Sequence, residues 1–166
     1  MNPTLVSVVI PCYNEQDNVP LLFERIRTVF LTMPEYACEC LFVNDGSTDG
    51  TRAAMDALAA EYPEMRPVHL VRNAGQSAAV VAGLRLARGE YVLTLDGDLQ
   101  NDPQDFARFL ELLKECDCVC GYRANRPNMD QTADLGVFFD YQYSGQGLKI
   151  DEVIEGGPLD KATSRV

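Results

Sequence analysis

The chain alternates two hydrophobic patterns over most of its length. Short apolar runs predict buried strands, and between them apolar residues recur at the three- and four-residue spacing of amphipathic helices. The predicted strands are residues 5–10, 40–43, 68–71, 91–95 and 116–122. The predicted helices are a segment capped by Asp17 or Asn18 that runs to about Thr32, one begun by Ser47-Thr48-Asp49, residues 77–88, and one that opens near Pro103.

This alternation predicts an α/β fold with a mostly parallel sheet and helices on both faces. The loops that follow the strands then meet at one edge of the sheet, where ligands bind in folds of this class. The repeat stops near Arg126, and glycine-rich, strand-like pieces follow it. We therefore expect one domain over residues 1–126 and an irregular or β-rich tail over residues 127–166.

Composition narrows the choice of partners. The chain has 166 residues, 46% of them hydrophobic, which is enough for one core, and its formal net charge is -11. Such acidity argues against nucleic acid and against an anionic membrane surface as the main partner, and a phosphate ligand would need a cation. With no apolar run of membrane-spanning length and no basic N-terminal leader, we expect a cytoplasmic protein, either free or peripheral to the face of the cytoplasmic membrane.

Six cysteines include the spaced groups Cys38-x-Cys40 and Cys116-x-Cys118-x-Cys120. Their spacing differs from the paired C-x2-C units of a zinc site, and His69 is the one histidine of the chain. We expect buried, reduced thiols.

The strongest chemical signal is Asp96-Gly97-Asp98, which follows the apolar run of residues 91–95. In an extended segment residues i and i+2 point the same way, so both carboxylates can converge on one hard cation such as Mg²⁺ or Mn²⁺. The alternative is a solvated Asp-Gly turn. The helix predicted after Pro103 favours the ligand site, because a strand that leads through an acidic loop into a helix is typical of the ligand-binding edge of α/β sheets.

Polar groups follow three other predicted strands as well. They lie in Tyr13-Asn14-Glu15, in residues 44–47 and in residues 72–76. Together with residues 96–100 they supply an aromatic ring for a base, carboxylates for ribose hydroxyls and a metal for a diphosphate. Each has a structural alternative when taken singly: a helix cap for Ser47 or Asp49, a turn at Asn73, a half-buried ring for Tyr13. The first loop lacks G-x-G-x-x-G, which argues against a dinucleotide-dependent oxidoreductase.

Residues 5–126 resemble the family 2 glycosyltransferases of GT-A fold, in the branch that transfers sugars to polyprenyl phosphates. The segments that carry the resemblance are residues 8–15, 43–49, 72–75 and 96–103. It implies an inverting, Mg²⁺- or Mn²⁺-dependent transfer from a nucleoside-diphosphate sugar, with UDP-sugar preferred and GDP-mannose as the alternative. The acceptor it implies is a polyprenyl phosphate.

The resemblance also implies roles for individual residues. Pro11, Tyr13 and Glu15 frame the base and ribose, Asp45 reads the base, and Asn73 and Gly75 complete the nucleotide site. Asp98 and Gln100 are the implied direct metal ligands, and Asp96 lies near the ribose or the metal. Arg123 is implied near the phosphates, with a surface cation as its alternative.

Beyond Arg126 the resemblance ends, and residues 136–162 resemble part of a PDZ domain. The acceptor half of the family is missing from this pattern, so a fusion, a truncation and a misassembled reading frame all stay open. The functional alternative is a non-catalytic module that binds a nucleotide sugar or a peptide. A haloacid-dehalogenase phosphatase would also use D-x-D, but Leu99-Gln100 fits that pattern poorly.

Overall fold

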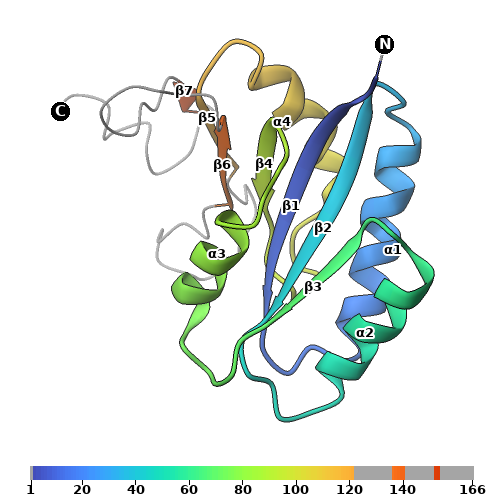
Figure 1. Ribbon diagram of the computed structural model, residues 1–166. Coiled ribbons are helices and arrows are strands. Elements are labelled where there is room, and N and C mark those ends of the chain that lie inside the picture. Colours follow the sequence, from blue (N-terminus) through green and yellow to red (C-terminus); the bar gives the residue numbers. More distant parts are fainter. Residues whose placement is uncertain (1, 122–135, 141–151, 154–166) are drawn as a thin grey trace, which may run out of the picture.

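The computed structural model describes residues 2–121, 136–140 and 152–153, which form an α/β fold around one sheet (Figure 1). Its strands are β1 (Thr4–Cys12), β2 (Tyr36–Asn44), β3 (Met65–His69), β4 (Tyr91–Thr94), β5 (Cys118–Gly121), β6 (Gly136–Asp140) and β7 (Glu152–Val153). The helices are α1 (Asn18–Leu31), α2 (Thr51–Glu61), α3 (Gln76–Leu84) and α4 (Phe106–Leu112), with a 3₁₀ turn, η1 (Pro103–Asp105), before α4.

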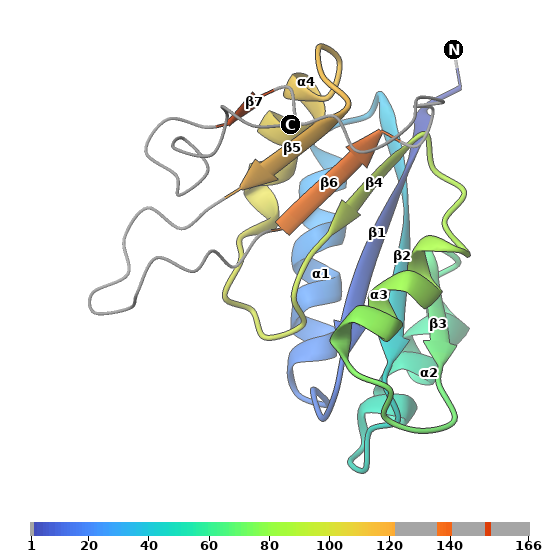
Figure 2. The same cartoon turned by 90° about the vertical axis from the view of Figure 1, so that its left-hand side faces the viewer.

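The strands follow the order β3-β2-β1-β4-β6-β5-β7. The pairs β1–β2, β1–β4 and β2–β3 are parallel, as predicted for helices that connect successive strands. The predicted strand at residues 116–122 is present as β5, and β6 lies antiparallel between β4 and β5, so the sheet is mixed at this end (Figure 2). The sheet thus includes a strand beyond residue 126, and the domain boundary near that residue stays a prediction.

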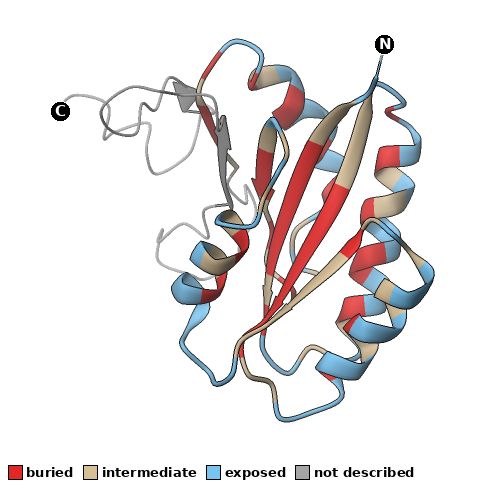
Figure 3. Ribbon diagram, in the orientation of Figure 1, coloured by how far each residue is buried: buried red, intermediate tan, exposed pale blue. Residues whose placement is uncertain are grey.

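Each face of the sheet packs against helices. Alternation along β1 sends Val6, Val8 and Ile10 to the face covered by α1, α2 and α4, where the larger buried cluster lies. Val9 points to the other face and packs with Ala79 of α3. Figure 3 shows these central strands as the most buried part of the fold. The predicted α/β class with helices on both faces is confirmed.

Several predicted boundaries are wrong by a few residues. The second helix begins at Thr51 rather than at residues 47–49, and α3 ends at Leu84 rather than near residue 88. The third strand is residues 65–69, and Val71, predicted to be its last residue, is fully exposed. The predicted side-chain cap of α1 is also absent, because the Glu15 carbonyl accepts from the first helical N–H groups while the Asp17 side chain makes no capping bond.

A buried polar network holds the segment that connects α3 to β4, at the edge of the sheet opposite the carboxyl ends of the parallel strands. Ser7 Oγ donates to Glu39 Oε1 over 2.5 Å, and the Arg88 N–H donates to the same oxygen over 2.7 Å. Arg66 donates to the second oxygen, Glu39 Oε2. Burial raises the pKa of Glu39, but these hydrogen bonds outweigh it and hold the pKa below its ordinary value.

All six cysteines are free thiols, four of them buried and two, Cys38 and Cys120, partly exposed. Within the described ranges, no helix is both long enough and apolar enough to cross a bilayer.

Candidate functional site

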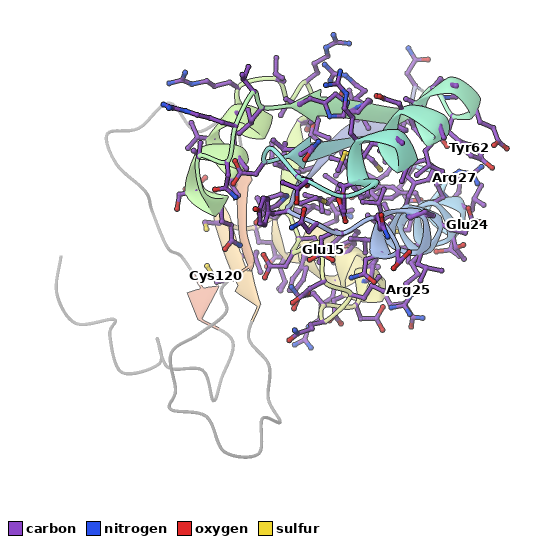
Figure 4. The ribbon with its side chains drawn as sticks, turned by 90° about the horizontal axis from the view of Figure 1, so that it is seen from below. Glu15, Glu24, Arg25, Arg27, Tyr62 and Cys120 are labelled. Atoms are coloured by element: carbon purple, nitrogen blue, oxygen red, sulfur yellow. The ribbon has the colours of Figure 1, made fainter. Side chains whose placement is uncertain are left out.

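The loops that follow β1, β2, β3 and β4 meet at one edge of the sheet and enclose a cavity of about 470 Å³. Figure 4 views the molecule from this edge, with Glu15 near its centre. The cavity is lined by Pro11, Cys12, Tyr13, Glu15, Asp45, Asn73, Gly75, Gln76, Asp96, Gly97, Asp98 and Gln100. The structure thus brings together every residue that the sequence predicts for the site except Arg123, which lies outside the described residues.

The β1–α1 loop is hydrogen-bonded to the β2–α2 loop and to the first residue of α2. The Asn14 N–H donates to Ser47 Oγ over 2.9 Å, and Asn14 Oδ1 accepts from the Thr48 N–H over 2.9 Å. The Glu15 N–H donates to Thr51 Oγ1 over 2.8 Å. These bonds keep the Tyr13 ring, 46% exposed, at the mouth of the cavity.

Ser47 and Asp49 therefore hold the two loops together and are not among the residues that line the cavity. The predicted helix cap at Asp49 is not formed as such, because the N-cap of α2 is Gly50. Asp49 instead accepts from the Thr51 N–H over 3.0 Å and from the Gln16 N–H over 3.3 Å, so it joins the start of α2 to the neighbouring loop. Desolvation raises the pKa of Asp49, but the hydrogen bonds from Thr51 and Gln16 outweigh it and lower the pKa.

Asp45 joins the second loop to the third. Its carboxylate is buried, Oδ1 accepts from the Ala74 N–H over 2.7 Å, and Oδ2 accepts from the Gly75 N–H over 2.9 Å. Each carboxylate oxygen has a second lone pair, so a base can still be recognised by this side chain. Asp45 thus shapes the cavity wall in addition to its predicted contact with the base.

The acidic loop after β4 packs closely against the first loop. A Cβ atom at Gly97 would lie 3.1 Å from both the Cys12 Sγ and the Pro11 carbonyl oxygen, so any larger residue there would have to push the two loops apart by a few tenths of an ångström. Asp98 Oδ1 accepts from the Gln100 N–H over 3.0 Å, and Asp96 Oδ1 accepts from Gln76 Nε2 over 2.8 Å. Asp96, Asp98 and Gln100 all line the same cavity, as predicted.

The cavity is strongly acidic. Glu15, Asp45, Asp96 and Asp98 contribute carboxylates, whereas the described residues that line it include no lysine, arginine or histidine. A diphosphate bound here needs a cation to offset the repulsion. Burial, and next the charge of Glu15, raise the pKa of Cys12, so its thiol stays neutral and is a poor metal ligand.

Carboxylate and amide oxygens are the ligands that suit Mg²⁺ and Mn²⁺, so the donor set around Asp96, Asp98 and Gln100 fits such an ion. Among the described side chains, no three carboxylate, imidazole or thiol groups gather closely enough to hold a metal by themselves. An ion at this place would therefore complete its coordination with phosphate oxygens and water, as Mg²⁺ commonly does.

Three cavity residues were not among the predicted site residues, Cys12, Gln76 and Gly97, the last of which stands between the two predicted carboxylates. Cys12 lies just beyond the predicted strand of residues 5–10, and its position against Gly97 follows only from the packing of two loops. Gln76 is the last of the polar residues 72–76 that the sequence places after a strand, but no role of its own was predicted for it.

Comparison with known proteins yields one family and a group of relatives. The model of the family described as Glycosyl transferase family 2 matches residues 7–153. The dodecaprenyl-phosphate galacturonate synthase of Rhizobium johnstonii is 41% identical over 124 residues, which are 73% of this chain and 36% of that protein. The undecaprenyl-phosphate 4-deoxy-4-formamido-L-arabinose transferase of Serratia proteamaculans is 44% identical over 126 residues, 73% of this chain and 37% of that protein. The chain thus spans little more than a third of the length of these relatives.

Solved structures agree with the fold. The mannosyltransferase PcManGT from Pyrobaculum calidifontis, in complex with GDP-Man and Mn²⁺, superposes with a TM-score of 0.56 at 26% identity, over 74% of this chain and 36% of that one. TarS 1-349 of S. aureus in complex with UDP gives a TM-score of 0.55 at 20% identity, over 76% of this chain and 38% of that one, which shows the fold alone. The predicted GT-A fold is confirmed for the matched part.

Proposed function

This chain belongs to glycosyl transferase family 2, and from that premise we propose that it forms the donor-binding part of an inverting, metal-dependent transferase that moves a sugar from a nucleoside diphosphate to a polyprenyl phosphate. The observation that carries the proposal is the acidic cavity, in which loops from four successive strands gather the predicted base, ribose and metal groups. The relatives named as polyprenyl-phosphate sugar transferases support the class of acceptor.

The residues divide the cavity into two ends. Tyr13 and Asp45 stand at the base end, where an exposed ring can stack and a buried carboxylate can accept from a ring N–H. Asp96, Asp98 and Gln100 stand at the diphosphate end and would hold the cation. When bound there, a divalent cation supplies Lewis acidity that stabilises the charge on the departing nucleoside diphosphate.

The proposed reaction needs few further catalytic groups from the protein. A lipid phosphate oxygen attacks the anomeric carbon from the face opposite the leaving group, so the bond to the diphosphate breaks and the configuration inverts. The attacking phosphate is already ionised, and no strong general base is needed. In agreement with this, His69 is not among the cavity residues and instead pairs with Asp56 at 2.9 Å through Nε2.

The donor base has two candidates. UDP-sugar is the donor we prefer, with GDP-mannose as the alternative, since an aromatic ring and one carboxylate can serve either base. The mannosyltransferase PcManGT was solved with GDP-Man and Mn²⁺, which supports GDP-mannose as the alternative.

Calorimetric titration tests the donor site directly. UDP and GDP are each titrated into the purified chain with Mn²⁺ and with a chelator, beside Asp98→Ala. We expect binding of one nucleotide that requires Mn²⁺ and is lost in Asp98→Ala. Absence of binding by either nucleotide in the presence of Mn²⁺ would overturn the proposal.

A second candidate is a module that binds a nucleotide sugar without transferring the sugar, since the cavity that gathers the proposed nucleotide and metal groups would serve binding alone equally well. Transfer is measured with radiolabelled donor and a short-chain polyprenyl phosphate in detergent. Formation of glycosylated lipid establishes the transferase. Metal-dependent nucleotide binding without glycosylated lipid and without donor turnover establishes the binding module.

A further inference from the structure

Gln76 occupies a special place at the diphosphate end of the cavity. It is the first residue of α3 and lines the cavity, and its Nε2 donates to Asp96 Oδ1 over 2.8 Å. The bond spans two loops, because Gln76 follows β3 and Asp96 follows β4. It therefore ties the acidic loop to a helix rather than to its own neighbours in sequence.

The helix that presents Gln76 is firmly seated. Gly83 of α3 lies so near the sheet that a Cβ atom there would be 2.4 Å from Val9 Cγ1. The residue before Gln76, Gly75, donates its N–H to the buried Asp45 carboxylate. The helix α3 is thus held near both of its ends, and the backbone of Gln76 is fixed opposite Asp96, within reach of its carboxylate.

The neutral side chain of Gln76 is a hydrogen-bond donor that suits a cation site. A lysine or arginine at this position would also hold the carboxylate, but its positive charge would cancel the charge that attracts a metal ion. The neutral amide donates one hydrogen bond and uses one of the roughly four lone-pair sites of the carboxylate. It orients Asp96 while the negative charge of the cavity is preserved.

We propose that Gln76 is a positioning residue that sets the orientation of the Asp96 carboxylate and thereby the affinity of the donor site for its divalent cation. This inference rests on the proposed function, because the cation is the one that would bridge the donor diphosphate. Residues that orient metal-binding side chains typically contribute on the order of 10- to 100-fold to metal affinity.

The experiment compares wild type, Gln76→Ala and Gln76→Lys, with Ser77→Ala as the matched control, because Ser77 is the next helical residue and is exposed but does not line the cavity. Electron paramagnetic resonance counts free Mn²⁺ during titration in the presence of saturating UDP or GDP, whichever nucleotide binds. Thermal unfolding in chelator measures the stability of each variant without metal.

We expect Gln76→Ala and Gln76→Lys to raise the Mn²⁺ concentration at half-saturation by about 10- to 100-fold, while Ser77→Ala leaves it unchanged. The lysine variant separates the effect of charge from that of geometry, since it keeps a hydrogen-bond donor beside Asp96 and is still expected to weaken Mn²⁺ binding. An unchanged half-saturation in both Gln76 variants would overturn the inference while leaving the proposed function intact. Wild type without any Mn²⁺-dependent nucleotide binding would overturn both.

Discussion

Asp45 and Gly75 are 30 positions apart in the sequence, and the Gly75 N–H donates to Asp45 Oδ2 over 2.9 Å at the wall of the cavity. Because the other oxygen of Asp45 accepts from the Ala74 N–H, one buried carboxylate fixes the loop from which α3 starts. Because the next residue along is Gln76, which donates to Asp96, Asp45 is connected to the end of the cavity proposed to hold the metal.

Replacing Asp45 by asparagine tests this connection. Asparagine has the same shape but presents an NH₂ group to one of the two loop N–H donors, and a buried donor left without an acceptor costs about 1–3 kcal/mol. We expect a loss of that size in the free energy of unfolding, measured by urea denaturation, together with weaker nucleotide binding. Asp17→Asn, on an exposed carboxylate without a capping bond, is the matched control. Unaltered unfolding in Asp45→Asn would contradict this role.

Two glycines at the cavity offer a second prediction, because they differ in what surrounds them. Gly46 has a φ of +66°, and a Cβ atom there would lie 2.4 Å from the Asn73 backbone nitrogen. Gly75 has a φ of +91°, but its Cβ would meet nothing within 4 Å. Gly75→Ala adds backbone strain alone, about 1–3 kcal/mol, whereas Gly46→Ala adds strain and forces two loops apart.

We therefore expect Gly46→Ala to destabilise the protein more than Gly75→Ala in urea denaturation. Gly46→Ala should also weaken nucleotide binding, since the displaced loop carries Asn73, which lines the cavity. Equal destabilisation by the two variants would mean that the loops can separate freely at Gly46.

The sequence predicted the order of strands and helices well because the apolar runs are strong and local. The wrong or missing predictions concern element boundaries and strand pairings that depend on contacts between residues distant in the sequence. The helix α2 begins at Thr51, later than predicted, because Asp49 and Ser47 bond the β1–α1 loop instead of forming the first turn. Val71 lies outside β3 because β3 stops pairing with β2 at His69. No local pattern could place β6 between β4 and β5, since that pairing joins segments from different parts of the chain.

The site was more predictable than the fold boundaries. Residues such as Asp96, Asp98 and Asp45 stand at strand ends, so topology alone brings them to one edge. The contact between Gln76 and Asp96 was not predictable, because it depends on how far the start of α3 reaches over the β4 loop.

The Glu39 network gives a prediction about pH. The pKa of Glu39 is lowered in the folded state, so its contribution to stability is fully present above the ordinary glutamate pKa of 4.5 and is lost as the pH falls through the lower folded value. Glu39→Gln should cost about 1–3 kcal/mol at pH 7 and should flatten the loss of stability below pH 4.5. Urea denaturation across this range, with exposed Glu35→Gln as control, measures both effects. A parallel pH profile in wild type and Glu39→Gln would contradict the assignment.

Cys120 on β5 should be the thiol that reacts first at neutral pH. A hydrogen bond from Cys118 lowers the pKa of Cys120 to about 7, although burial raises it, and the side chain is partly exposed. Alkylation by iodoacetamide, followed residue by residue with mass spectrometry, should therefore show a midpoint near pH 7 for Cys120, because the thiolate is the nucleophile. Cys118→Ala removes the hydrogen bond and should move this midpoint up toward the ordinary value of 9.0. Cys12, whose pKa burial raises, is the internal reference that stays unmodified, and an unchanged Cys120 profile in Cys118→Ala would show that another group stabilises the thiolate.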